Sequence, residues 1–147
     1  MRNVTSQTRF LRVLGPAAAA ATNLNSAIID LAGYDNVTVL GSFNSVTAGS
    51  NSRMLVQAAS VNSANSMQTL AGAEAVLTDN SAGQIAVVEI ANPRHRYARV
   101  QVRRADENSV LDSVVVMLSK HGREPVTQTA VVGDDGHVLV HAPAAAT

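Results

Sequence analysis

The sequence contains no cysteine and no tryptophan, and aromatic residues make up only 3% of its 147 residues. Without cysteine the chain can form neither a disulfide nor a thiolate metal site. With so few aromatic rings it is poorly supplied for a stacking pocket that would bind sugars or nucleobases. These absences weigh against several common classes of binding protein and leave the compartment of the protein open.

Charged residues are also scarce, at 15% of the chain against a typical ~25%. The formal net charge is zero, so bulk charge attracts neither nucleic acid nor a membrane surface. No apolar run approaches the ~20 residues that a transmembrane helix needs. A surface of small uncharged residues has two interpretations: it is covered in an assembly, or the chain is simply a β protein rich in small residues.

The apolar residues lie in short runs, and no segment keeps a helical period. Residues 97–102 alternate between apolar and polar side chains, which predicts a strand with one buried and one wet face. Residues 110–118 are apolar on both faces, which predicts a strand buried on both sides. Together with residues 85–90 these runs predict a three-stranded antiparallel meander. Its adjacent strands should share four core residues: Val100, Val102, Val114 and Val116.

Seven or eight short strands at ~8–12-residue spacing, separated by Gly-, Asn- and Ser-rich turns, predict an all-β fold, either an antiparallel β-sandwich or a jelly roll. The expected strands occupy residues 27–32, 37–43, 53–59, 73–77, 85–90, 97–102 and 110–118. We place the sandwich domain at residues 23–119. Residues 1–22 are expected to form an extended N-terminal arm, with an edge strand as the alternative, and residues 120–147 a C-terminal arm with a hairpin.

No residue pattern indicates catalysis. The chain has four histidines: His95, His121, His137 and His141. The last two would lie ~13 Å apart along a strand, which is too far to share one zinc ion. The sequence has no Gly-x-Ser-x-Gly elbow and no phosphate-binding loop. We therefore expect a protein that is not an enzyme and has no metal or cofactor.

The most distinctive charge feature is a cluster of five arginines within eleven residues: Arg94, Arg96, Arg99, Arg103 and Arg104. The planar fork of arginine suits bidentate pairing with carboxylates and phosphates. Three interpretations stay open: docking onto an acidic protein surface, binding to a nucleic-acid backbone, and pairing with Asp and Glu on neighbouring strands. The N-terminal arm offers a second candidate set of partner-binding residues: Arg2, Arg9, Phe10 and Arg12.

Four stretches between residues 23 and 127 carry a resemblance to a known family. They read IIDLAGYDNV at 28–37, LAGA at 70–73, VVEIANPRHRY at 87–97 and GREPVT at 122–127. In this order they resemble a family of small virion structural proteins of tailed bacteriophages. The resemblance implies a capsid-associated or other virion component and brings no active site with it; we expect it on the capsid surface.

The leading hypothesis for its place in the particle is a capsid decoration (cement) protein that binds the major capsid protein, since such proteins are often small, abundant, β-rich and trimeric. Together with the low charge density and the small-residue surface, the resemblance predicts a homo-oligomer, with a trimer favoured. The zero net charge and the short apolar runs predict no membrane partner. Both arms are then expected to bind the shell or a neighbouring subunit, unless the N-terminal arm packs on its own sandwich. The alternatives are another virion component of the neck or tail, a nucleic-acid-binding module that uses the arginine cluster, and a sugar-binding or hydrolytic sandwich.

Overall fold

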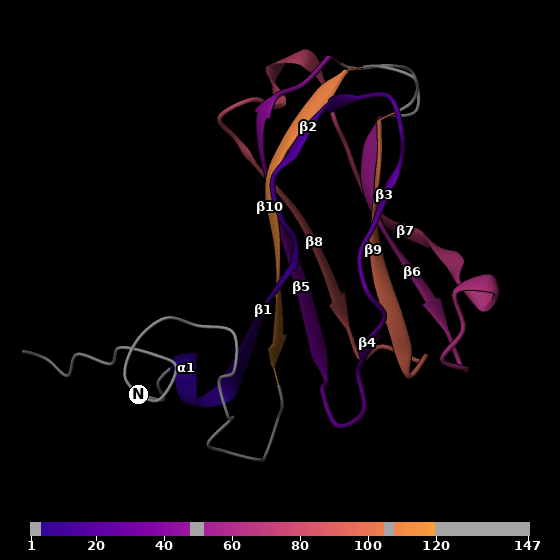
Figure 1. Ribbon diagram of the computed structural model, residues 1–147. Helices are drawn as coiled ribbons and strands as arrows, with labels where there is room; N and C mark the ends of the chain where they lie inside the picture. The colour runs from indigo at the N-terminus through magenta and orange to yellow at the C-terminus, as the bar shows by residue number, and fades with distance from the viewer. Residues whose placement is uncertain (1–3, 48–51, 105–107, 120–147) are drawn as a thin grey trace, which may run out of the picture.

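In the computed structural model, two antiparallel β-sheets pack face to face as a β-sandwich (Figure 1). The structure describes residues 4–47, 52–104 and 108–119. Sheet A contains β1 (Thr8–Leu14), β2 (Ala17–Ala20), β5 (Asn36–Ser45), β8 (Ile85–Ala91) and β10 (Ser109–Ser119). Sheet B contains β3 (Leu24–Asn25), β4 (Ile29–Asp30), β6 (Arg53–Ala59), β7 (Gln68–Val76) and β9 (Tyr97–Arg103). The described helical segments are short: α1 (Val4–Gln7), η1 (Ala64–Ser66) and η2 (Asp79–Ser81).

The strand order is that of an eight-stranded jelly roll. Strands β1 and β2 both pair with β10, and β3 and β4 both pair with β9, so each couple acts as one interrupted strand. The strands between them in the sequence pair in the same order, the first with the last: β5 pairs with β8, and β6 pairs with β7. The chain thus resembles one long hairpin rolled into two sheets. The all-β sandwich predicted from the strand spacing is confirmed.

The predicted meander is wrong, although its three strands exist. Strands β8 and β10 lie in sheet A whereas β9 lies in sheet B, so each connection crosses to the other sheet. Strand β9 pairs with β6, and β10 pairs with β5. The alternation of a strand specifies which of its faces is buried, but it does not specify which strand lies beside it.

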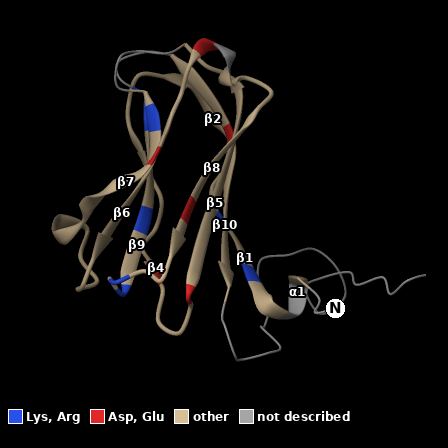
Figure 2. Ribbon diagram, turned by 180° about the vertical axis from the view of Figure 1, so that it is seen from behind, with Lys and Arg blue, Asp and Glu red and all other residues tan. Residues whose placement is uncertain are grey.

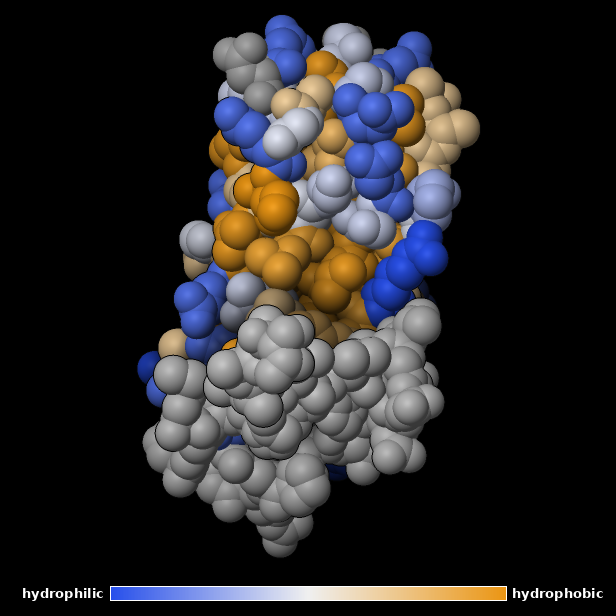
Figure 3. Space-filling view, turned by 90° about the vertical axis from the view of Figure 1, so that its left-hand side faces the viewer, coloured by the Kyte–Doolittle hydropathy of each residue, from blue (hydrophilic) through white to orange (hydrophobic). Residues whose placement is uncertain are grey.

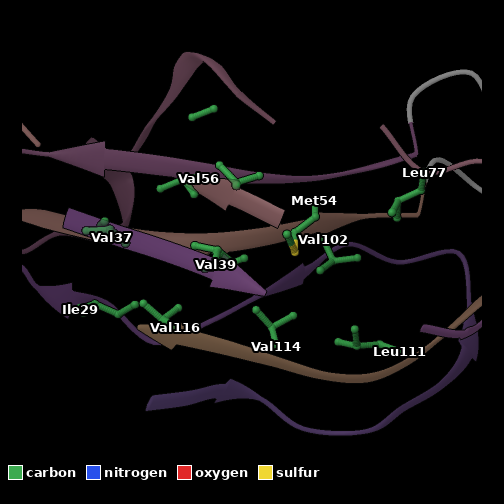
Figure 4. Close-up of a cluster of buried hydrophobic side chains, with 14 of the residues drawn as sticks. Ile29, Val37, Val39, Met54, Val56, Leu77, Val102, Leu111, Val114 and Val116 are labelled. Carbon is green, nitrogen blue, oxygen red and sulfur yellow. The ribbon is translucent and has the colours of Figure 1, made fainter. Parts of the chain in front are cut away.

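The core lies between the two sheets and is made mainly of β-branched side chains (Figure 4). Val100, Val102, Val114 and Val116 are each at most 1% exposed, so their prediction as core residues is confirmed. They come from opposite sheets and meet in one buried cluster instead of standing on adjacent strands. Val115 and Met117, on the other face of β10, are only half-buried. The expected burial of this strand on both sides is therefore incomplete.

The N-terminal segment forms one edge of sheet A. Strand β1 pairs with β10, and Leu11, Val13 and Leu14 pack against the core. The chain then crosses to sheet B between β2 and β3. The structure places residues 8–20 inside the sandwich, as the edge-strand alternative expects, and not in an arm outside it. Residue 2 and the C-terminal arm with its hairpin, residues 120–147, lie outside the described residues.

Candidate interaction surface

The five clustered arginines do not form one surface, because they are spread over the turn before β9, the strand itself and the residue after it (Figure 2). Two of them lie on the outer face of sheet B. Nε of Arg99 donates to Oε1 of Gln57 at 2.6 Å, and Nε of Arg103 donates to Oε1 of Gln101 at 2.8 Å. Gln101 donates in turn to Oδ1 of Asn25 at 2.8 Å. The polar side chains of this face therefore satisfy one another.

Arg104 is 3% exposed and ties the N-terminal segment to the sandwich. Its Nε donates to the carbonyl oxygen of Thr22 at 2.6 Å, and Nη2 donates to Oγ1 of the same residue at 3.0 Å. Its Nη1 donates to the carbonyl oxygens of Ala18 at 2.7 Å and Ser109 at 3.1 Å. Burial lowers the pKa of this guanidinium, yet an arginine stays protonated at neutral pH. Arg104 is thus a structural cross-link and is not available to a partner.

Arg96 forms a two-pronged ion pair with Asp30, with Nε–Oδ1 and Nη2–Oδ2 distances of 3.1 and 3.0 Å. The hydrogen bond from Arg96, followed by one from the Ala32 N–H, holds the pKa of the Asp30 carboxyl below its usual value of 3.8. Both side chains are exposed, so the pair contributes little to stability. Pairing with a neighbouring carboxylate, one of the three interpretations of the cluster, describes this arginine.

Arg94 and His95 line a hollow of about 450 Å³ between β7 and β8. The hollow exists because β7 bulges: its register with β6 shifts between Leu55 and Gln57, and Gly72 has a φ of +79°. The walls are mostly small and apolar. Nδ1 of His95 lies 3.3 Å from Oγ of Ser60. Among the described residues no group of three or more His, Asp or Glu could hold a metal ion.

The outer face of sheet A carries more large apolar side chains than that of sheet B, where Leu55 is buried and Val76 is exposed. The pairing register aligns Val115 with Leu40 and Val87 in one row, and Met117 with Phe10 in the next. Because Val116 between them is buried in the core, alternation puts these rows on the outer side. We call the following set the sheet A apolar face: Phe10, Leu40, Ile85, Val87, Val115 and Met117.

Figure 3 shows hydrophobic surface gathered in the middle of this side of the molecule. Ile85 and Val87 are 66% and 53% exposed, and the other four residues are half-buried. An antiparallel sheet that covers one core normally presents polar residues on its outer face. An exposed apolar patch of this kind typically marks a contact with a partner. The sheet A apolar face is therefore the candidate interaction surface.

The candidate partner-binding residues of the N-terminal segment lie on different sides of sheet A. Phe10 belongs to the sheet A apolar face, and Arg12 borders it in the row of Val115. Arg9 pairs with Leu118 and has the opposite parity, so it lies on the other side of the sheet. The sequence signal for this face is the second apolar row of β10, Val115 and Met117, which predicts a second buried side.

Neither a protein-family model, nor a curated protein, nor a solved structure matches the chain. The surfaces described above and the sequence resemblance are therefore the indications of function for this chain. None of the described helices is long and apolar enough to cross a membrane.

Proposed function

We propose that the protein is a non-enzymatic structural component of a virion: a capsid decoration protein that binds the major capsid protein on the head shell as a small homo-oligomer. The observation that carries this proposal is the sheet A apolar face. Covering apolar surface is favourable by about 25 cal/mol per Å², and this face has two highly exposed members, Ile85 and Val87. The shell supplies the cover.

The difference between the two outer faces supports a protein that lies on a surface. Polar side chains on the outer face of sheet B pair with one another. Arg99 donates a hydrogen bond to Gln57, and Arg53 forms an ion pair with Glu74 at 2.9 Å. Such a face is compatible with water. A sandwich with one face more apolar than the other suits a molecule that contacts a shell on one side and solvent on the other.

Two further observations are consistent with the proposal. The jelly roll is a fold used by viral capsid domains, although lectins and cupins use it too, and a fold alone does not determine function. The four stretches that resemble small virion proteins are spread over roughly residues 23–127, a span that includes the sandwich. The nucleic-acid alternative is weakened because Arg96, Arg99 and Arg104 are bound to groups of the protein itself.

The test is the binding of the purified full chain to head shells assembled from the major capsid protein of the same phage, measured by co-sedimentation. Met117→Lys places a charge on the sheet A apolar face and should weaken binding at least about tenfold, because an unpaired charge would be buried. The matched control is Val76→Lys on β7, which replaces a residue that is 62% exposed. This control should bind like the unmodified chain.

Imaging of purified particles then locates the bound chain. Density on the head lattice that depends on Met117 is the expected result. Unchanged shell binding by Met117→Lys, or no binding by the unmodified chain, would refute the proposal. Density at the neck or tail would instead establish the alternative of another virion component.

A further inference from the structure

The sandwich has four edges in its described part, and three of them are protected against pairing with another strand. Native sheets protect edges with bulges, charges, prolines or very short strands. Strand β1 has a register shift between Arg12 and Leu14 and is followed by Pro16. On sheet B, β3 and β4 are only two residues long each, and β7 carries the bulge at Gly72.

Strand β8 is long and has no bulge, and its protections are limited to one charge, Glu89, and to Pro93 two residues beyond its end. It pairs with β5 over seven consecutive residues without a register shift, from Asn36↔Ala91 to Ser42↔Ile85. Its sequence, IAVVEIA, contains one charge and neither proline nor glycine. In residues 4–47, 52–104 and 108–119, no strand pairs with its other side. A regular apolar edge of this kind is a template for strand addition.

We propose that β8 pairs antiparallel with β8 of a second copy of this chain about a two-fold axis, which joins the two A sheets into one continuous sheet. The edge is complementary to itself. Antiparallel pairing with Val87 opposite Val87 of the second copy brings together two side chains that are each 53% exposed. Residues that lie directly opposite have Cβ atoms about 4.5–5.5 Å apart and contact each other.

The charges of the two strands are compatible with this register. Glu89 would lie opposite Ile85 of the second copy, so the two Glu89 residues would be about 13 Å apart along the strands. At that distance exposed charges are largely screened at physiological ionic strength. Each Glu89 keeps its hydrogen bond from Nδ2 of Asn36, at 2.7 Å within one copy. A two-fold contact therefore leaves no like charges in contact.

The contact extends the sheet A apolar face across two subunits. It has two-fold symmetry, unlike the trimer that the family resemblance implies. The contact forms in the isolated protein and does not need a shell. Its presence or absence can therefore be tested independently of the proposed function. A pair of seven-residue strands covers less than the ~800 Å² per partner of a standard interface, so we expect dissociation in about the micromolar range.

The absence of cysteine from the sequence allows a direct test by cross-linking. Opposite residues of antiparallel strands have Cα atoms about 4.5–5.5 Å apart, which is within the range of a disulfide. Val87→Cys of the full chain should form a disulfide-linked dimer when glutathione disulfide oxidises the two thiols and is itself reduced to glutathione. Val76→Cys is the matched control, since Val76 is 62% exposed but lies on β7. Equal cross-linking of the two variants would overturn the proposal.

A charge swap tests the register. In the two-fold register residue 87 faces itself, so Val87→Lys alone and Val87→Glu alone should each be monomeric by sedimentation equilibrium from about 1 to 200 µM. An equimolar mixture of the two should restore the dimer, because the charges then pair across the strands. The proposal is refuted if the unmodified chain stays monomeric over this range, if it forms a trimer that both variants retain, or if the mixture does not dimerise.

Discussion

Replacing Arg104 with methionine should release the N-terminal segment from the sandwich. Met preserves the apolar stem but removes four hydrogen bonds, which now reach the carbonyl oxygens of Ala18, Thr22 and Ser109 and Oγ1 of Thr22. The residue is 3% exposed, so water cannot freely replace the lost donors. The perturbation therefore reports on whether this side chain holds the two sheets and the crossing segment together.

The expected loss in the free energy of unfolding is the difference between lost hydrogen bonds and an avoided desolvation cost. Hydrogen bonds to a charged group are worth about 1.5–3 kcal/mol each, and removing one donor leaves the buried acceptors unsatisfied. Against this, burying the guanidinium itself costs several kcal/mol in desolvation, which Met does not incur. We expect a net loss of about 3 kcal/mol in the free energy of unfolding. For a chain of this size that corresponds to a fall in melting temperature of roughly 6–12 °C.

The assay is urea denaturation followed by circular dichroism, with Arg103→Met as the matched control. Arg103 is the neighbouring residue, is half-buried and donates to Gln101. Its replacement should cost less than about 1 kcal/mol. Limited proteolysis should cut residues 15–23 faster in Arg104→Met than in the control. If the two variants have the same free energy of unfolding, Arg104 is not the cross-link that its geometry indicates.

Three further predictions concern the core and the exposed ion pair. Val100→Asp should cost several kcal/mol, because a residue 1% exposed would bury an unpaired charge; an unchanged melting temperature would contradict the core assignment. Gly41→Ala should lose about 1–2 kcal/mol, since its Cβ would lie 2.5 Å from Sδ of the fully buried Met54; a gain in stability would show that Met54 moves aside. The pair formed by Asp30 and Arg96 should stabilise the protein above the usual carboxyl pKa of 3.8 and lose this effect as the pH falls through the lower folded pKa. The small difference in urea midpoint between the unmodified chain and Asp30→Asn should therefore vanish between about pH 7 and pH 2, and its persistence at the acidic end would contradict the assignment.

The sequence located strands well because alternation is a local property. Residues 53–59 match β6 (Arg53–Ala59), and residues 97–102 match β9 (Tyr97–Arg103) to within one residue. The pairing of the strands could not be found in the same way. In a jelly roll most partners are far apart in sequence, as Phe10 and Met117 are, and nothing local selects between a neighbour in the same sheet and one across the core.

The sequence alone could have predicted that Arg103 and Arg104 lie on opposite faces of the sheet, because side chains alternate along a strand. Arg104 has the same parity as Val100 and Val102, so period two already places it on the core side of β9. Arg103 has the opposite parity and lies on the outer face. Counting arginines in a window treats neighbours in sequence as neighbours in space, and in a strand adjacent residues point to opposite faces. The length and direction of the Arg104 hydrogen bonds still required the structure.

Strands β9 and β10 show where the functional information of this chain lies. Both present an inner row of valines to the same core, and that row would be equally suitable in any sandwich. They differ on the outer face, where β9 carries Arg99 bonded to Gln57 and β10 carries Val115 and Met117. The core explains why the chain folds but does not select a partner. The outer row of β10 contributes little to the core, so its apolar side chains are available for the contact with a shell that we propose.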